Sequence, residues 1–341
     1  MSTTPFPLPL PTGIHPHDLP EIRAELAAWL VADGPDGGPA VWAEGFDAQT
    51  AAQERQAAAD WAHSLRLADL YFATTDMTRL SVAAGAALPR YRLHHEDLPS
   101  HHGLVVWEEP VADAYEGAGN VGAPITAATW AQAGHGVHVR IWVTRENWLR
   151  YTAIGDPRIG LRDLSRKEIS QLRRRLPQPL VCFMSSYLPF GQVPGWLRDR
   201  PPADSGLSLL EFEARERSHD QLQETERALV VTWLLLGQTI TDTKVLRAGK
   251  TFAKRVARLA PDLPTAVRYV DLRHHRHVFR ERHDGEPSIH YQHQWVVHGH
   301  WRNHYFPSRH DHRPIWIDDY LKGPDGAPIL DPDKLVHVLR H

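Results

Sequence analysis

The stretch "HHGLVVWEEP", His101–Pro110, decides the fold class, because it introduces strand character into a chain that begins as helix. The stretch "GVHVRIWVT", Gly136–Thr144, repeats that character after a connection rich in Gly and Ala. Upstream, "PEIRAELAAWLVADGPDGG" predicts a helix from about Pro20 to Ala32, with proline in the first turn and glycines at the end. A longer, alanine-rich helix is expected from about Thr50 to Phe72, so a helical layer precedes the sheet.

Helix and strand patterns alternate downstream. "LSRKEISQLRRRLP" predicts a helix that opens with Ser165 and Glu168 in capping-box spacing, and "PLVCFMSSYL" predicts the next strand. "LSLLEFEARERSHDQLQETERALVVTWLLLGQTI" carries apolar positions at helical spacing and should enter the core at Trp233 to Leu236. The sequence therefore predicts an α+β protein with a helical N-terminal layer, a mainly antiparallel sheet, a long helix and a C-terminal β-hairpin.

Proline and glycine suggest how the chain is divided. The start, "MSTTPFPLPLPTG", predicts a flexible proline-rich tail over residues 1–16. A unit of helices and sheet is expected over 17–188, followed by a loop or linker over 189–206, where prolines and glycines cluster. Residues 207–341 are expected to form a C-terminal unit with the long helix, a basic helix and a hairpin rich in His and Trp.

Composition limits the classes of function. The 341 residues are 42% hydrophobic and 23% charged, as in globular proteins, and the net charge of −3 gives no global attraction for nucleic acid or anionic membrane. Any site for a polyanion must therefore be local. The longest apolar run, "ALVVTWLLLG", is too short to cross a bilayer, and the N-terminal pattern is not that of a targeting signal. The single cysteine, Cys182, indicates a core thiol and favours a reducing, cytoplasmic setting.

The segment "KVLRAGKTFAKRVAR", Lys244–Arg258, contains six cationic side chains and no acid. Spacings of three and four residues predict that most of them share one helical face, where they would meet successive phosphates. The six are Lys244, Arg247, Lys250, Lys254, Arg255 and Arg258. The alternative is a solvated helix that balances the acidic residues Glu211, Glu213, Glu216, Glu224 and Glu226. A nucleotide-binding P-loop is excluded, because Lys244 stands where that motif requires its first glycine.

A second cluster lies in "QWVVHGHWRNHYFPSRHDHRPIWI", Gln294–Ile317, with five histidines, three tryptophans and three arginines. A strand that begins this cluster is expected to be followed by the loop "NHYFPSRHDH" and a returning strand from Arg313 to Asp318. Gly299 is expected to mark a bulge or the close approach of another backbone. If this segment is an extended strand, its side chains alternate between two faces. The aromatic side chains would then lie on a packed face, and His298, His300 and Arg302 on a polar face.

Histidine pairs in this cluster suggest a metal site as an alternative function. The pairs are His298 with His300, and His310 with His312. Asp311 or Asp284 would add a carboxylate, as in a three-ligand zinc site. No HExxH or cysteine-based spacing accompanies them, and histidine is frequent elsewhere in the chain. The sequence consequently predicts no metal and no other cofactor, and no catalytic residue stands out by its spacing.

Interleaved arginine and aromatic residues in the same cluster favour single-stranded RNA. Guanidinium groups clamp phosphates through paired hydrogen bonds, and aromatic rings stack on bases with a contribution of ~1–3 kcal/mol each. The arginines are Arg302, Arg309 and Arg313, and the aromatic residues are Trp301, Tyr305, Phe306 and Trp316. The alternative is that these rings form the core of the hairpin.

An ordered pattern in this region also carries a resemblance. Its residues are Val297, Gly299, His300, Trp301, Arg302, Asn303, Arg313, Ile315, Trp316, Ile317, Lys322, Gly323 and Pro324. The pattern resembles the C-terminal signature of a phage and mobile-element family of type V-A anti-CRISPR inhibitor-like proteins. "GLVVWEEP" with "PITAATWAQ", and "ALVVTWLLLGQTI", are similar to that family in kind and order. The resemblance implies a fold and a type of contact surface, in a family whose best-known member recognises a nascent Cas12-type nuclease and promotes loss of its message.

The leading hypothesis is a non-catalytic regulator that binds RNA, a ribonucleoprotein or a nascent polypeptide, without membrane contact. The residues expected at the interface are Lys244, Arg247, Lys250, Lys254, Arg255, Arg258, His298, His300, Trp301, Arg302, Arg309, Arg313 and Trp316. One alternative is a metal-dependent hydrolase or nuclease built on the C-terminal histidines. Another is a module that binds only protein. The sequence does not indicate the oligomeric state.

Overall fold

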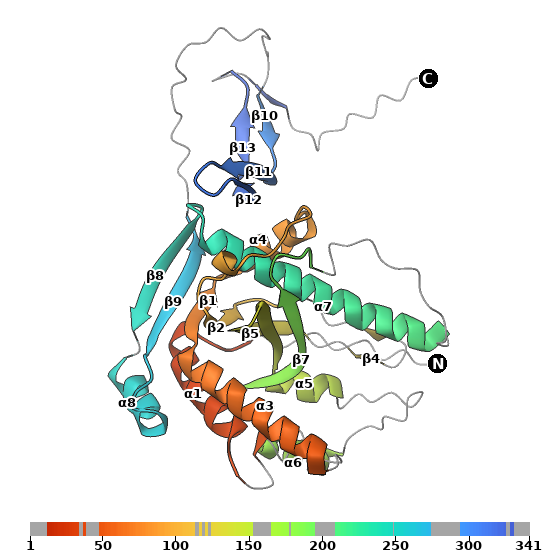
Figure 1. Cartoon of the computed structure of the whole chain (residues 1–341), viewed down its shortest axis with the longest axis vertical. Coiled ribbons are helices and arrows are strands. Elements are labelled where there is room, and N and C mark those ends of the chain that lie inside the picture. Colours follow the sequence, from red (N-terminus) through yellow and green to blue (C-terminus); the bar gives the residue numbers. More distant parts are fainter. Residues whose placement is uncertain are drawn as a thin grey trace. The chain divides into compact units, whose positions relative to one another are not determined.

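A computed structural model describes most of the chain (Figure 1). The described residues are 12–33, 37–38, 48–112, 116–117, 120–121, 124–152, 165–176, 179–194, 209–247, 249–273, 294–324 and 328–330. Contacts divide the chain into two compact units, Met1–Leu272 and Arg273–His341. The expected boundary at 189–206 differs from this division, because the long helix and two later strands belong to the first unit.

A seven-stranded mixed sheet forms the centre of the first unit. Its strands, in spatial order, are β7 (Leu180–Pro189), β6 (Gly136–Thr144), β5 (Ile125–Ala133), β2 (His102–Trp107), β1 (Asp69–Ala73), β9 (Ala266–Leu272) and β8 (Thr241–Arg247). β1 pairs in parallel with β2 and β9, and the other neighbours pair antiparallel. The predicted α+β class with a mainly antiparallel sheet is confirmed.

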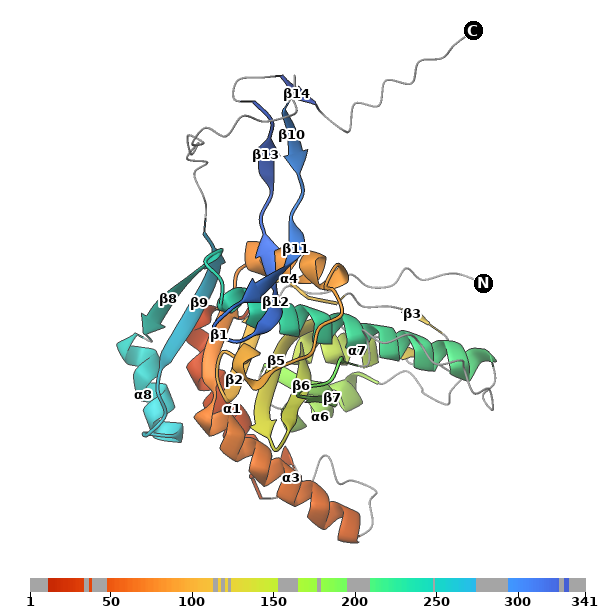
Figure 2. The same cartoon turned by 45° about the horizontal axis from the view of Figure 1, so that its top comes forward.

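Helices cover both faces of this sheet. Figures 1 and 2 show α1 and α3 on one face, and α4 and α7 on the other. Their bounds are α1 (Leu19–Leu30), α3 (Ala48–Leu67), α4 (Thr75–Ala86) and α7 (Leu209–Leu236). The shorter helices are η1 (Pro16–Asp18), η2 (His95–Asp97), α5 (Arg145–Thr152), α6 (Arg166–Arg175) and α8 (Lys250–Leu259). None of the described helices has the length and apolar character that a bilayer span requires.

The alternation of side chains along β1 explains why both faces are buried. Leu70 and Phe72 join the core cluster under α1 and α3, whereas Tyr71 points to the opposite face. There the Tyr71 ring lies 5.5 Å from Trp130 of β5, which in turn contacts Trp233 of α7 edge-to-face at 5.4 Å. Trp233 is fully buried, so the predicted insertion of the apolar end of this helix into the core is confirmed.

Two local predictions meet different outcomes. Ser165 caps α6, accepting the backbone N–H of Glu168 while the Glu168 carboxylate accepts the N–H of Ser165, as the capping box requires. The helix expected to reach Phe72 instead ends at Leu67, and β1 follows at once. Pairing with strands on both sides outweighs helical propensity in these residues, since β1 lies near the middle of the sheet.

Small sheets complete the described structure. In the first unit, β3 (Glu116–Gly117) pairs with β4 (Asn120–Val121). In the second unit, β10 (Gln294–Val297) lies between β13 (Tyr320–Lys322) and β14 (Ile329–Leu330). The predicted hairpin is formed by β11 (His300–Phe306) and β12 (Asp311–Ile317). Its turn spans only residues 307–310, so most of the expected loop "NHYFPSRHDH" is strand.

A buried arginine joins three distant segments of the first unit. Arg23 of α1 donates a hydrogen bond to the carbonyl of Ala68, just before β1, at 2.8 Å, and another to the carbonyl of Pro264, just before β9. Burial lowers the pKa of Arg23 to about 10, which leaves the guanidinium charged at neutral pH. Charged donors make the stronger hydrogen bonds, and their loss leaves the acceptors unsatisfied.

We predict that Arg23→Met lowers the free energy of unfolding by about 2–4 kcal/mol, because two backbone carbonyls lose a charged donor. Urea denaturation followed by circular dichroism measures the change. Arg23→Lys retains a cationic donor and should recover part of the loss. An unchanged midpoint in Arg23→Met would show that this bridge does not stabilise the fold.

Candidate nucleic-acid interface

The expected basic helix over Lys244–Arg258 is two elements in the structure. Thr241–Arg247 forms β8, which pairs with β9 along its whole length, and α8 begins at Lys250 after the N-cap Gly249. Pairing with β9 fixes the first part as strand, although its charges have helical spacing. Because side chains alternate along a strand, Lys244 and Arg247 point to opposite faces. The prediction of one shared helical face is therefore wrong for these two residues.

The apolar side of α8 packs against α1. Val256 is buried with Ala24 of α1, in a small cluster that also includes Ala260 and Leu263. At the start of the helix, Phe252 contacts the ring of His17 edge-to-face at 4.7 Å. These contacts fix which side of α8 faces the protein.

Arg255 is the cation of α8 that α1 neutralises. Its guanidinium lies 2.7 Å from the Glu21 carboxylate of α1 and 5.8 Å from the centre of the Phe252 ring. Burial and repulsion from Glu21 raise the pKa of the neighbouring Glu25, and Arg255 offsets part of that rise. The acid that pairs with Arg255 therefore comes from α1. The side chains of Glu211, Glu213 and Glu216, which the alternative invoked, lie outside the described residues, and Glu226 is buried.

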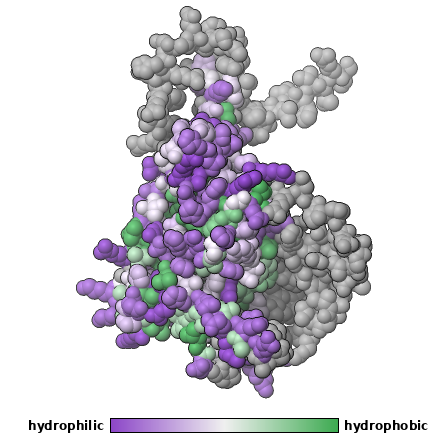
Figure 3. Space-filling view, in the orientation of Figure 1, coloured by the Kyte–Doolittle hydropathy of each residue, from purple (hydrophilic) through white to green (hydrophobic). Residues whose placement is uncertain are grey.

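Three exposed cations remain on the outer side of α8: Lys250, Lys254 and Arg258, here called the α8 stripe. They follow one another at intervals of four residues, about 6 Å along the axis, and so share one face. Among the described residues, none of the three forms an ion pair. In Figure 3, hydrophilic side chains project on the left, where Figure 1 places α8 and β8.

Register separates the side chains of the hairpin into two faces. His300, Arg302 and His304 lie on one face of β11, and the Arg302 guanidinium contacts the His304 ring at 3.0 Å. Trp301 pairs directly with Trp316 on the other face, where the two indoles meet edge-to-face at 5.4 Å. The predicted separation of aromatic and polar faces is confirmed for these residues. His298 is exposed and lies in the short connection between β10 and β11.

Gly299 lies where a side chain would collide with Trp316. A Cβ at this position would come within 2.5 Å of the Trp316 ring and 3.1 Å of Asp319, whose carboxylate accepts the Gly299 N–H. The close approach predicted from the sequence therefore exists, but an indole makes it instead of another backbone.

The arginines expected to clamp phosphates differ in access. The Arg313 side chain is only 14% exposed and lies 4.0 Å from the Asp311 carboxylate. Little of its guanidinium is therefore accessible to a phosphate. Arg302 and Arg309 are exposed. Of the rings expected to stack on bases, Tyr305 is exposed, while Trp301 and Trp316 are partly covered by each other.

The two histidine pairs lie at opposite ends of the hairpin. His300 pairs with Ile317 at one end, whereas His312 pairs with Tyr305 near the turn. Five residues of strand, about 17 Å, separate the two positions, which is too far for one ion. No group of three or more His, Cys, Asp or Glu side chains in the described parts of the chain is arranged to hold a metal, and Asp284 lies outside them.

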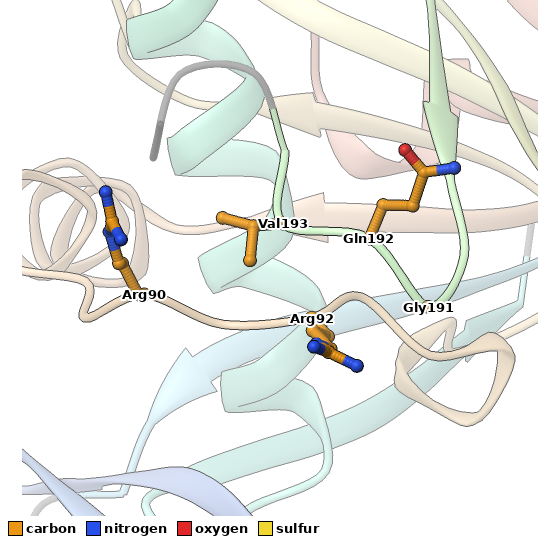
Figure 4. Close-up of a pocket in the computed structure, with 5 residues that line it drawn as sticks. All are labelled: Arg90, Arg92, Gly191, Gln192 and Val193. Carbon is orange, nitrogen blue, oxygen red and sulfur yellow. The ribbon is translucent and has the colours of Figure 1, made fainter. Parts of the chain in front are cut away.

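A pocket in the first unit was not predicted from the sequence. Arg90 and Arg92 lie on one segment, opposite Gly191, Gln192 and Val193, around an open space of about 370 Å³ (Figure 4). A backbone hydrogen bond of 2.8 Å from Gly191 to the carbonyl of Leu93 joins the two segments. The two arginines lie beside Gly191–Val193 only because the fold brings these two segments together.

The thiol of Cys182 packs against the core under α1 and α3. Burial raises the pKa of Cys182 to about 11, and the nearby Arg140 offsets only part of this rise. A thiol of this kind remains protonated near neutral pH, which agrees with the expected core role.

No protein-family model matches the chain, and no curated protein or solved structure matches it significantly.

We predict that Cys182 reacts with iodoacetamide about 100-fold more slowly at pH 8 than an exposed cysteine, because little of it is thiolate. Mass spectrometry of timed samples measures the rate, and the urea-unfolded protein supplies the reference. Similar rates in the folded and unfolded protein would contradict a protected thiol.

We predict that Gly299→Ala displaces Trp316 and disturbs the Trp301–Trp316 pair, because the new methyl group overlaps the indole. The indole N–H resonances of both tryptophans, followed by nuclear magnetic resonance, should shift. Ser308→Ala, an exposed change in the turn, is the matched control and should leave both resonances in place.

Proposed function

We propose that this protein is a non-catalytic regulator that binds RNA, alone or in a ribonucleoprotein, and that the α8 stripe makes the principal phosphate contacts. The single observation that supports the proposal is the division of α8. One side is fixed to α1 by Val256 and by the ion pair of Arg255 with Glu21, and the other presents three exposed cations. Helix geometry then sets the charge spacing before any ligand arrives.

The expected strength of this interaction is modest. Each phosphate neutralised on a single strand contributes a slope of about −0.7 to the dependence of log affinity on log salt, so three contacts give a slope of about −2. A fourfold rise in salt then weakens binding by about 20-fold. The net charge of −3 adds no attraction of its own, so binding should be confined to this local surface.

The hairpin of the second unit offers a complementary set of groups. Arg302 and Arg309 are exposed cations, and Tyr305 presents a ring on which a base can stack. Arg313 and the paired tryptophans hold the hairpin together in this proposal. A regulatory role for such binding is what the resemblance to anti-CRISPR inhibitor-like proteins implies, and the CRISPR target of that family is not part of the proposal.

We predict that charge reversal of the α8 stripe, Lys250→Glu with Lys254→Glu and Arg258→Glu, weakens binding of a labelled single-stranded RNA of about 20 nucleotides by at least 10-fold. The salt slope should also become shallower by about 2. Fluorescence anisotropy over a salt series measures both. Arg255 stays unchanged because its reversal would break the contact with Glu21 and disturb packing on α1.

The control places the same three charge reversals on α6, at Arg166, Lys167 and Arg174, which are also exposed. This variant has an identical net charge and should retain most of the affinity. Equal losses in both variants would show that total charge governs binding. Unchanged binding in the α8 variant would contradict the proposed site.

A further inference from the structure

Among the described strands, none pairs with the outer edge of β8. β8 is the last strand on its side of the seven-stranded sheet, and within the described residues β9 alone pairs with it. That pairing runs from Thr241 opposite Leu272 to Arg247 opposite Ala266. A strand paired on one side only leaves backbone N–H and C=O groups along its other side, and these groups can bind an extended polypeptide.

Apolar side chains at this edge are exposed on both faces of the sheet. Val245 is 62% exposed and Leu246 is 40% exposed. Consecutive strand residues point to opposite faces, so the two cannot both be covered by one helix. A strand added beside β8 would place side chains next to both of them.

The charges around these apolar residues favour an acidic occupant. Lys244 and Arg247 flank Val245 and Leu246 in the sequence of β8. The one acid of β8, Asp242, lies 3.4 Å from Lys244 and neutralises it only partly, because both side chains are exposed. A second copy of this chain would bring two further cations to the same edge at a strand spacing of about 4.8 Å, where like charges repel.

We propose that β8 binds an extended acidic segment of a partner polypeptide as an additional strand of the sheet. The segment carries two apolar residues between two acids. The acids lie opposite Lys244 and Arg247, and the apolar residues lie opposite Val245 and Leu246. Backbone hydrogen bonds hold the segment, and the flanking charges select it.

The test uses the full chain and a fluorescein-labelled peptide, acetyl-Thr-Glu-Ile-Val-Glu-Thr-amide. N-methylation at alternate residues removes one set of backbone donors. Because alternate N–H groups of an added strand point toward β8, methylation of one set should weaken binding at least about 10-fold, and methylation of the other set should change it less than about 2-fold. Fluorescence anisotropy measures the affinities.

The role of the flanking charges is tested by exchanging acidic and basic residues between the peptide and the protein. A peptide with Lys in place of both Glu should bind the natural protein at least about 10-fold more weakly. It should bind the double variant Lys244→Glu with Arg247→Glu better than the acidic peptide does. Shifts in the amide resonances of residues 241–247 on peptide addition would locate the contact on β8.

Three results would overturn the proposal: no saturable binding of the acidic peptide, equal effects of the two methylation sets, or a dimer in sedimentation experiments that Val245→Lys dissociates. The RNA proposal does not depend on this outcome, because it concerns the α8 stripe. Loss of RNA binding on reversal of the stripe, with peptide binding retained, would separate the two surfaces.

Discussion

The hydrogen bonds of Arg23 are the interaction on which the arrangement of the first unit depends. They join α1 to the residues just before β1 and β9, which are almost 200 positions apart in the chain. β9 can then pair in parallel with β1, and an ion pair of 2.9 Å between Asp69 and Arg268 adds to that pairing. β8, the antiparallel neighbour of β9, is then the edge strand, and α8, which connects the two strands, packs against α1.

This arrangement explains how a chain with a net negative charge presents a basic surface. α1 contributes carboxylates at the place where α8 packs, but only Arg255 is close enough to pair with Glu21. The α8 stripe lies on the other side of the helix, away from these acids, because Val256 and Phe252 occupy the inner side. Separation of charge therefore follows from amphipathic packing of one short helix.

Local patterns in the sequence predicted the parts of the fold that short-range physics controls. The capping box of α6, the apolar end of α7 and the two-faced hairpin all follow from spacing within about ten residues, and all are present. The errors concern long-range pairing. Lys244 and Arg247 have helical spacing but lie on a strand because they pair with β9. The helix expected to reach Phe72 ends at Leu67 because β1 pairs with strands on both sides. Arg90 and Arg92 line one pocket with Gln192, about 100 positions later in the chain, only because the fold brings the two segments together.

A strand and a helix offer different kinds of binding surface, and the segment from Thr241 to Leu259 contains one of each. Away from its ends, α8 pairs its backbone groups within the helix, so its outer side offers side-chain charge, which suits a phosphate chain and is weakened by salt. β8 offers backbone donors and acceptors together with apolar side chains, which suit an extended polypeptide. Because the cations of the two elements are separate, each surface can lose its charge without removing that of the other. A ribonucleoprotein, with polypeptide and RNA in one particle, is the kind of ligand that could engage both.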